Sequence, residues 1–215
     1  QGPNQVANTL VVMAGGFGKR LMPITKTTPK PMIDVGGRPI LAHIIEKGKS
    51  EGFINIVISV FYLDEQIKAY FGDGEKFGLH ISYIEEPSPL GTAGALSMMS
   101  KRPKEDFVVT NGDIISKVPF KQMLDYHKAY QAKGTMAVYP QSWENPFGVV
   151  ETDGVDIIKI EEKPVQRNNV NAGVYVLSPD AIEYIPEKQN FSMPDVFSAL
   201  RKNHHRTIAY PIHES

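Results

Sequence analysis

The sequence predicts an α/β protein whose mainly parallel sheet is covered by helices on both faces. Short continuous apolar runs alternate with segments of helical apolar spacing through the first half of the chain, and this alternation is typical of parallel strands joined by crossover helices. The 215 residues, 41% of them hydrophobic, are enough to bury one sizeable core, so a single domain is the default.

The first strand is expected at Thr9 to Met13, a short run of apolar residues. A helix follows at Pro39 to Ser50, where apolar residues recur at helical spacing, and Gly52 is a suitable stop for it. Residues 54–60 are again continuously apolar and predict the second strand. The order strand, helix, strand is therefore set early in the chain.

The same alternation continues to the middle of the chain and then changes. Helices are expected at 63–71, 92–99 and 120–131, with strands at 81–84 and 107–110. Beyond them the pattern is one of strands separated by turns, with a hairpin signal at Glu151 to Gly154. We expect this half to add mixed or antiparallel strands to the same sheet and to form a lobe that faces a substrate. Its strands are expected at 135–139, 148–151, 155–161 and 174–177, and helices return at 179–185 and 193–202.

Charge, hydropathy and cysteine content exclude several classes of protein. The net charge of −1 provides no global basic field, so a nucleic-acid partner is not expected. No apolar run approaches the roughly 20 residues of a membrane span, so no membrane partner is expected either. The chain has no cysteine, which rules out a disulfide framework, a thiolate metal site and a cysteine nucleophile, and is compatible with the cytoplasm, where we expect the protein.

A glycine-rich loop directly after the first predicted strand is the strongest chemical signal. The loop reads Ala14-Gly15-Gly16-Phe17-Gly18-Lys19-Arg20. Glycines let backbone amides approach phosphate oxygens, and the two cations offset the charge of a triphosphate. The loop is not a Walker loop, because no Gly-Lys-Ser/Thr ends it, and its spacing is not G-x-G-x-x-G.

A second cation stands between two prolines, in Thr28-Pro29-Lys30-Pro31-Met32. The prolines hold Lys30 in an extended segment, which limits the entropy lost when the lysine meets a phosphate. On its own such a segment is more often an ordinary connection.

The stretch from Gly15 to Met32 resembles the signature of the sugar-1-phosphate nucleotidyltransferases. Four later segments agree with that family in the same chain order: Glu86 to Gly94 is similar to its base-contacting loop, Asn111 to Asp113 to its metal-binding strand end, and 161–164 and 171–173 to its sugar-phosphate segments. The resemblance covers nearly the whole chain from Leu10. It implies a Rossmann-like three-layer sandwich with an inserted sugar-binding lobe.

The same resemblance implies an activity and its site. The partners would be a nucleoside triphosphate and a sugar 1-phosphate, joined with release of pyrophosphate, and the cofactor would be Mg²⁺. Asp113 follows a predicted buried strand, where open α/β sheets bind ligands, and its carboxylate suits this metal. The expected catalytic residues are Arg20, Lys30, Asp113 and Lys163; the nucleotide-binding residues are Ala14, Gly15, Gly16, Phe17, Gly18, Lys19, Glu86, Gly91 and Thr92; the sugar-phosphate-binding residues are Gly148, Glu162, Lys163 and Asn171.

Glu86 bears on the choice of base. Relatives that use thymidine or uridine nucleotides often carry glutamine there, whereas a carboxylate can accept both adjacent donors of guanine. The sequence of residues 89–94 resembles that of guanylyltransferases for mannose, heptose and glucosamine 1-phosphates. This resemblance and the carboxylate of Glu86 together favour GTP. Thymidylyl or uridylyl specificity is the alternative, and the neighbouring Glu85 is a second candidate for the base contact.

The sugar is suggested only by the segment 143–149. It is similar to a group of bacterial nucleotidyltransferases that carry amino-terminal CBS domains and activate glucosamine 1-phosphate for nonulosonic (legionaminic) acid synthesis; polysaccharide synthesis is the broader expectation. Gly148 would let the sugar ring approach the backbone, whereas Trp143 is as suitable for packing as for a sugar platform.

We expect residues 1–8 to be a linker or expression remnant and 9–215 to be the catalytic domain. Family members usually continue with a Trp-x-Asp-x-Gly stretch whose aspartate is the second metal ligand, and this chain stops at Ser215. The expectation is therefore a catalytic domain that lacks its carboxyl-terminal end. A missing amino-terminal regulatory domain and assembly as a homo-oligomer are both left open.

Three other functions share part of this sequence pattern. A non-catalytic regulatory homologue that binds nucleotide sugar is the strongest, given the missing second aspartate. A nucleotide-dependent oxidoreductase fits poorly, because the glycine spacing is wrong and no acidic residue follows at the ribose distance. A molybdenum-cofactor guanylyltransferase shares the glycine-rich opening but not the segments 161–164 and 171–173.

Overall fold

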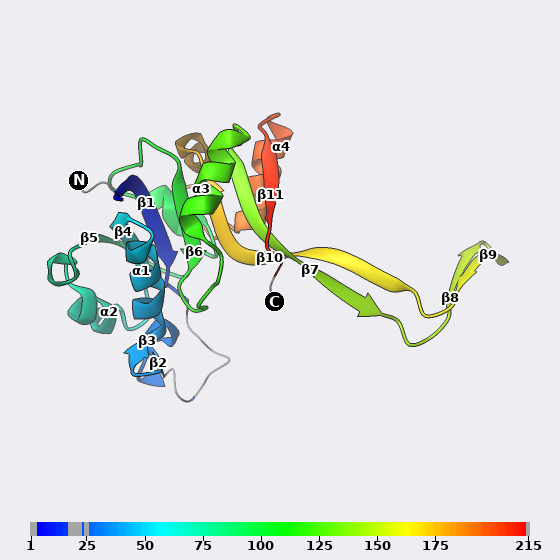
Figure 1. Ribbon diagram of the computed structural model, residues 1–215, viewed down its shortest axis with the longest axis horizontal. Helices are drawn as coiled ribbons and strands as arrows, with labels where there is room; N and C mark the ends of the chain where they lie inside the picture. Colours follow the sequence, from blue (N-terminus) through cyan, green and yellow to red (C-terminus); the bar gives the residue numbers. More distant parts are fainter. Residues whose placement is uncertain (1–3, 17–22, 24–25, 214–215) are drawn as a thin grey trace.

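The computed structural model describes residues 4–16, 23 and 26–213. Its centre is a seven-stranded sheet with the order β11-β7-β10-β6-β1-β4-β5 (Figure 1). The strands are β1 (Val6–Met13), β4 (Phe53–Val60), β5 (His80–Glu85), β6 (Phe107–Asn111), β7 (Gly134–Glu144), β10 (Val165–Leu177) and β11 (Thr207–Pro211).

The sheet is mixed and mainly parallel, as expected. β6, β1, β4 and β5 run parallel to one another, and β11 is parallel to β7. Only β10 runs against both of its neighbours, β6 and β7. The carboxyl ends of β1, β4 and β6 therefore meet at one edge of the sheet, the edge where α/β proteins bind ligands.

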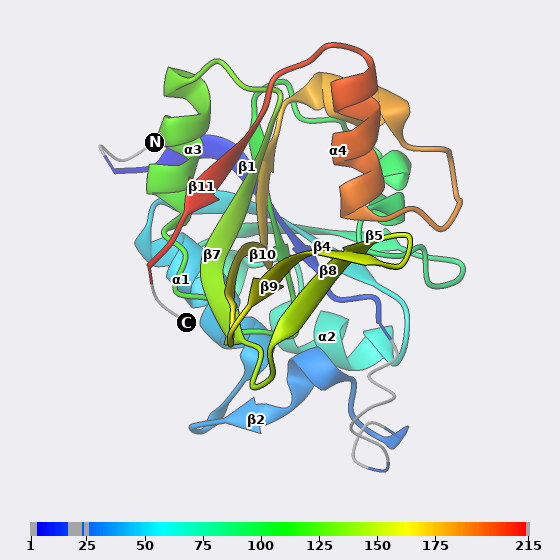
Figure 2. The same cartoon turned by 90° about the vertical axis from the view of Figure 1, so that its right-hand side faces the viewer.

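Helices cover both faces and give three layers (Figure 2). On one face α1 (Ile40–Ser50), α2 (Asp64–Phe71) and α3 (Phe120–Ala129) bury a core around Leu10, Leu41 and Phe53. On the other, α4 (Met193–Lys202) and the 3-10 helices η5 (Gly94–Met98) and η6 (Pro179–Tyr184) bury a second core around Val11 and Phe107. Two consecutive residues of β1, Leu10 and Val11, thus enter opposite cores, because successive side chains of a strand point to opposite faces of the sheet.

Several elements differ from the sequence-based expectations. The segments 92–99 and 179–185 form the 3-10 helices η5 and η6 in place of α-helices, because each is short and begins at Gly94 or Pro179. β1 starts at Val6, three residues before the expected Thr9. Five short elements were not expected: η3 (Lys30–Met32), β2 (Asp34–Val35), β3 (Arg38–Pro39), η4 (Glu75–Phe77) and β11.

The second half of the chain builds an arm in place of a compact lobe. β7 and β10 pair far beyond the sheet, and the hairpin of β8 (Val149–Asp153) and β9 (Asp156–Glu161) lies at their end, away from the body (Figure 1). We call residues 140–169 the arm. Every residue of β8 and β9 is exposed. The expected strands and hairpin are present, but the lobe does not lie against the sheet.

None of the helices in the described ranges combines the length and apolar character that crossing a membrane requires.

Candidate active site

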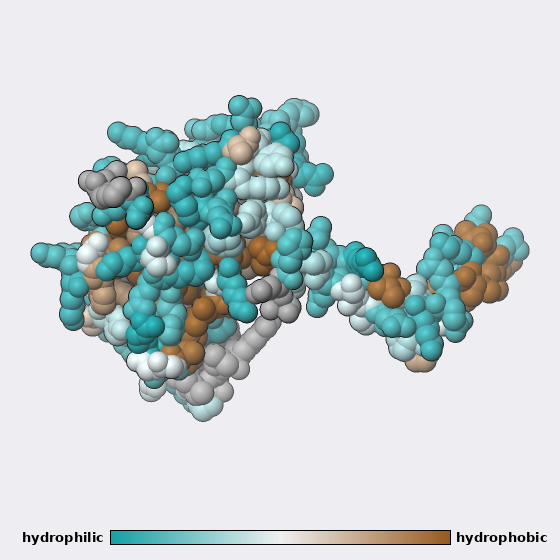
Figure 3. All heavy atoms as spheres, in the orientation of Figure 1, coloured by the Kyte–Doolittle hydropathy of each residue, from teal (hydrophilic) through white to brown (hydrophobic). Residues whose placement is uncertain are grey.

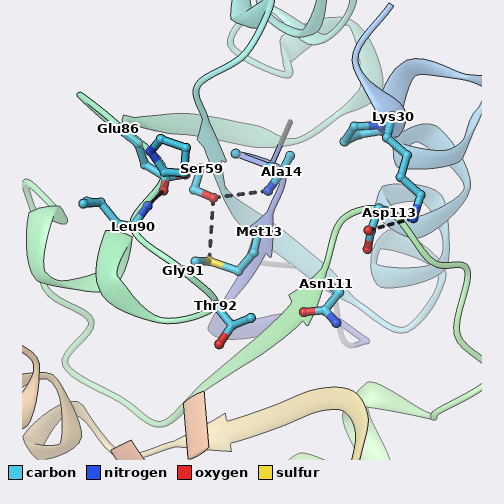
Figure 4. Close-up of a pocket in the computed structure, with 14 residues that line it drawn as sticks. Met13, Ala14, Lys30, Ser59, Glu86, Leu90, Gly91, Thr92, Asn111 and Asp113 are labelled. Atoms are coloured by element: carbon cyan, nitrogen blue, oxygen red, sulfur yellow. Dashed lines mark hydrogen bonds and ion pairs between the residues drawn. The ribbon is translucent and has the colours of Figure 1, made fainter. Parts of the chain in front are cut away.

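A cavity of about 250 Å³ opens at the carboxyl ends of β1, β4 and β6 (Figure 4). Two walls face each other across the end of β1: the loop that follows β5, and the segment that carries Lys30 together with Asp113 (Figure 4). The lining residues are Met13, Ala14, Gly15, Gly16, Lys30, Pro31, Ser59, Glu86, Pro89, Leu90, Gly91, Thr92, Asn111 and Asp113.

The first wall contains a buried carboxylate, that of Glu86, which is only 7% exposed. Its Oε1 accepts a hydrogen bond from the backbone N–H of Leu90 at 3.1 Å. Burial raises the pKa of Glu86, while the hydrogen bonds from the Leu90 amide and the Ser59 side chain act in the opposite direction. A carboxylate oxygen can accept more than one hydrogen bond, so this group is suited to accept further donors from a ligand.

Glycine is required where the loop after β1 meets this carboxylate. A Cβ on Gly15 would lie 1.7 Å from Oε2 of Glu86, whereas a Cβ on Gly16 would meet nothing within 4 Å. The start of the loop is held to β4, since the Ala14 amide donates to the backbone O of Ser59 at 3.0 Å and lies 3.2 Å from its Oγ. The backbone of β1 is thereby fixed against Glu86.

The second wall carries an ion pair. The Nζ of Lys30 lies 3.0 Å from Oδ2 of Asp113, and both side chains are partly exposed to the cavity (Figure 4). Asp113 is positioned by Gly112, whose amide donates to the Met13 carbonyl at 2.8 Å and whose missing side chain allows the two strands to approach. Lys30 is positioned in η3, between Pro29 and Pro31.

The loop after Glu86 is locked to helix α4. Gly91 has φ of +77° and packs against the Phe191 carbonyl, so a side chain there would be strained and crowded. The Thr92 hydroxyl accepts a hydrogen bond from the Met193 amide at 2.7 Å. Thr92 thus lines the cavity, but its hydroxyl is hydrogen-bonded to the first residue of α4.

The sugar-phosphate residues expected from the sequence lie elsewhere. Gly148, Glu162 and Lys163 are on the arm, where a Cβ on Gly148 would lie 3.3 Å from a Glu162 oxygen. Lys163 is exposed and has φ of +45°, a rare backbone conformation for a residue with a side chain. The structure therefore brings these three together with each other, but not with the cavity.

Asn171 lies at the base of the arm. Its Oδ1 accepts from the Gly173 amide at 2.8 Å and its Nδ2 donates to the Tyr175 hydroxyl at 2.8 Å. A Cβ on Gly173 would in turn lie 2.6 Å from Nδ2 of Asn111, a cavity residue. Asn171 thus shapes the junction between arm and cavity.

Four expected site residues, Phe17, Gly18, Lys19 and Arg20, lie outside the described residues. Ala14, Gly15 and Gly16 of the same loop do line the cavity. Ser59 lines it too and was missed by sequence reasoning. A signal existed, because Ser59 interrupts an apolar strand near its carboxyl end, where a buried polar residue is most useful to a ligand.

The residues described contain no group of three or more histidine, aspartate or glutamate side chains that could hold a metal alone. Asp113 is the carboxylate beside the cavity on the Lys30 side. Mg²⁺ is commonly held by one or two carboxylates together with substrate phosphates and water. The donor chemistry at Asp113 therefore fits magnesium bound jointly with a polyphosphate, and does not form a closed protein cage.

Comparison with known proteins gives one family and consistent relatives. The family model described as "Nucleotidyl transferase" matches residues 9–214. A mannose-1-phosphate guanyltransferase of Kluyveromyces lactis is 36% identical over 202 residues, 88% of this chain and 55% of the relative. The chain thus spans about half the length of the curated relatives it matches.

Solved structures agree. A putative glucose-1-phosphate thymidylyltransferase from Bacillus anthracis superposes with a TM-score of 0.77 at 25% identity, covering 96% of this chain and 87% of the other. HddC from Yersinia pseudotuberculosis gives a TM-score of 0.71 at 26% identity, covering 95% and 90%. The expected three-layer α/β fold is confirmed by these likenesses.

Proposed function

The chain belongs to the nucleotidyl transferase family, and from that membership we propose that it transfers a nucleotidyl group from a nucleoside triphosphate to a sugar 1-phosphate. The products are a nucleotide sugar and pyrophosphate. The relatives named mannose-1-phosphate guanyltransferases support this reaction class.

The observation that carries the proposal is the layout of the cavity. A buried carboxylate, Glu86, lines one wall, and the Lys30–Asp113 pair lines the other, at the edge of the sheet where ligands bind. A nucleotide has the matching asymmetry, with base donors at one end and a polyphosphate at the other. The geometry supports a base beside Glu86 and phosphates beside Lys30.

GTP is the proposed nucleotide. The N1–H and amino group of guanine are adjacent donors that one carboxylate can accept together. Glu86 faces the cavity, whereas Glu85 is exposed and pairs with Lys68 on the surface, so Glu86 is the better candidate for the contact. Glutamine at this position would suit a pyrimidine better.

The reaction needs no protein nucleophile. An oxygen of the sugar 1-phosphate attacks the α-phosphorus, a new P–O bond forms, and the bond to the β-phosphate oxygen breaks so that pyrophosphate leaves. We propose that Lys30 leaves Asp113 to neutralise phosphate charge, that Arg20 and Lys163 add cations, and that the protein acts mainly by positioning. Magnesium held at Asp113 would neutralise charge on the phosphates and orient them.

The remaining expected contacts complete the proposal. The backbone of 14–19, with Gly91 and Thr92, would hold the nucleotide; Gly148, Glu162, Lys163 and Asn171 would hold the sugar phosphate. Those residues of the first group that the structure describes all border the cavity. Gly148, Glu162 and Lys163 of the second group lie on the arm and Asn171 lies at its base, so the proposed sugar-phosphate site requires the arm and the cavity to come together.

The test is pyrophosphate release with Mg²⁺ from GTP, dTTP, UTP, CTP and ATP, each paired with mannose, glucosamine and glucose 1-phosphates. We expect release with GTP and one sugar phosphate, and its loss in Asp113→Ala. Pyrophosphate release with only dTTP or only UTP would show that the proposed base, guanine, is wrong. Saturable nucleotide binding without release from any pair would favour the binding-only homologue instead.

The sugar and the cellular location are also proposals. We propose two sugars to compare: glucosamine 1-phosphate, for nonulosonic acid synthesis, and mannose 1-phosphate, for polysaccharide synthesis. We propose that the protein acts in the cytoplasm, where GTP is supplied. The sugar that supports release decides between the two routes.

A further inference from the structure

A second cavity, of about 920 Å³, lies at the amino-terminal ends of β1, β4 and β5, and we call it the groove. Val57 of β4 lines the groove and also packs against the second core. The groove therefore opens on the sheet face that carries α4. Ser59, two residues further along the same face of β4, lines the active-site cavity. The two cavities share no lining residue, but they follow one another along one strand.

The floor of the groove is a row of polar side chains on three neighbouring strands. Thr9 pairs with Asn55, and Asn55 pairs with His80, so the three side chains point to the same side of the sheet. Ser82 lies in the next row, opposite Val57. Thr9 and Asn55 are half-buried, whereas His80 and Ser82 are exposed. Side chains of these types both donate and accept hydrogen bonds, so the floor is suited to hydroxyl groups.

Three cations line the groove on its β6 side. They are Lys101, Arg102 and Lys104, in the segment that leads into β6. All three are exposed, and none has an ion pair or a side-chain hydrogen bond with the part of the chain that the structure describes. Glu105 follows them but does not line the groove. Arginine and lysine are effective partners of phosphate groups, so this side of the groove is suited to a phosphate.

Carboxylates line the groove on its β5 side. Asp73 and Glu75 belong to the segment that leads into β5. β1 and β4 separate β6 from β5 in the sheet, so three inter-strand spacings of about 4.8 Å, roughly 14 Å in all, lie between the two sides. A second phosphate on the β5 side would be repelled, whereas hydroxyl groups can donate hydrogen bonds to carboxylates. The groove therefore favours a ligand that is anionic at one end only.

The lining also bears on the uncharged part of the ligand. None of the lining residues in the described part of the chain is phenylalanine, tyrosine or tryptophan, the side chains on which a nucleobase usually stacks. Hydrophilic residues cover most of the body in the view of Figure 3 as well. A group with several hydroxyls fits the hydrogen-bonding floor better than a base does.

We propose that the groove is a second ligand site, which binds a sugar monophosphate with its phosphate at Lys101, Arg102 and Lys104 and its hydroxyls on the floor. The inference does not depend on the proposed function, because no residue of the active-site cavity takes part in it. A ligand in the groove contacts β4, the strand whose Ser59 accepts the hydrogen bond of the Ala14 amide at the active site.

The test is calorimetric titration of the whole chain with glucose 6-phosphate and with mannose 6-phosphate. Neither probe is a sugar 1-phosphate, so neither is a substrate of the proposed reaction. We expect saturable binding of one molecule per chain, weakened about 10-fold or more when Arg102→Met and Lys104→Met are combined, because charged hydrogen bonds are lost. Both side chains are exposed, so the melting temperature should not change. No saturable binding of either probe, or equal binding by the double variant, would overturn the site.

Two control variants locate the ligand. Lys76→Met removes an exposed lysine that lies next to Glu75 in the chain but does not line the groove, so it should bind the probe as the parent does. Lys30→Met removes a cation of the active-site cavity and should also leave binding unchanged. Weaker binding by Lys76→Met would show only a general effect of charge, and weaker binding by Lys30→Met would place the probe in the active-site cavity. Either result contradicts the proposal.

Competing ligands define the chemical class. Inorganic phosphate should bind about 10-fold more weakly than the sugar phosphates, because it makes no hydrogen bonds to the floor. Fructose 1,6-bisphosphate should also bind more weakly, and Glu75→Gln should reduce that difference, because the second phosphate then meets less negative charge. Equal affinity for inorganic phosphate would indicate a general anion site, and tighter binding of AMP would indicate a nucleotide site. Both outcomes would overturn the assignment to a sugar monophosphate.

Discussion

The Nζ of Lys30 and Oδ2 of Asp113 lie 3.0 Å apart on one wall of the cavity, although 83 positions separate the two residues in the chain. The pair links η3 to the end of β6. Because both side chains are partly exposed, such a pair contributes only about 0–1 kcal/mol to folding. The pair therefore contributes little to stability, and the proposed function assigns both groups to the ligand.

Substitution of either Lys30 or Asp113 should therefore affect activity much more than stability. Asp113→Ala and Lys30→Met should each lower kcat by about 10²- to 10³-fold, the loss typical when a group that stabilises a transition state is removed, with melting temperatures close to that of the parent. The double variant should lose less than the product of the two single losses, because in the proposed function both groups act on the same phosphates. Steady-state pyrophosphate assays and thermal melts check both statements. A large fall in melting temperature with unchanged kcat would show a purely structural pair.

Gly15 and Gly16 offer a matched pair of substitutions. Gly15→Ala would insert a Cβ 1.7 Å from Oε2 of buried Glu86, and overpacking of this kind costs about 1–3 kcal/mol, equivalent to a fall in melting temperature of about 2–12 °C in a chain of this size. Nucleotide binding should weaken with it. Gly16→Ala meets nothing within 4 Å and should leave the melting temperature unchanged. Equal melting curves for the two variants would contradict the contact.

Glu86 predicts a pH dependence of stability. Burial raises the folded-state pKa above the ordinary value of 4.5, so the folded state binds this proton more tightly than the unfolded state. Stability is therefore highest below pH 4.5 with respect to this group, and falls as pH rises through the raised pKa. Glu86→Gln removes the titration and should melt higher than the parent at pH 8, with a smaller gain at pH 4.5. A gain that is the same at both pH values would count against the buried charge.

Substitutions of two lysines on the arm can distinguish a specific contact with the sugar phosphate from a general effect of positive charge. Lys163→Met should raise the KM for the sugar 1-phosphate by about 10- to 100-fold, the loss expected when a charged hydrogen bond of about 1.5–3 kcal/mol is removed, with little change in the KM for the nucleotide. Lys159→Met is the control, since Lys159 is already paired with Glu161 at 2.5 Å. Similar effects of both substitutions would show that only the overall charge of the arm matters.

Much of the sheet could be predicted from hydrophobic patterning. Helix α4 has the expected bounds Met193–Lys202, and the first strand, its loop and the carboxyl end of β6 lie together as expected. These elements are predictable because their apolar periodicity is decided by burial in one core. β11 was missed because its five residues alternate only weakly and depend on pairing with β7.

The arm could not be predicted in the same way. Patterning placed strands at 148–151 and 155–161, but nothing in the spacing of Gly148 or Lys163 tells how far β7 and β10 pair beyond the sheet. That length depends on backbone pairing and on the bulge beside Gly173, which are tertiary features. The side chain of Glu86 shows the converse case, since sequence identified the residue, but its burial against Gly15 depends on the fold.

All described residues that line the cavity come from positions 13 to 113, whereas the arm occupies positions 140 to 169. The arm joins the rest of the molecule only through two adjacent paired strands, so it can be replaced as a cassette at Pro140 and Asn169. Because the proposed sugar contacts lie on the arm and the proposed base contact lies in the cavity, grafting arms between relatives should change the sugar that is used without changing the nucleotide.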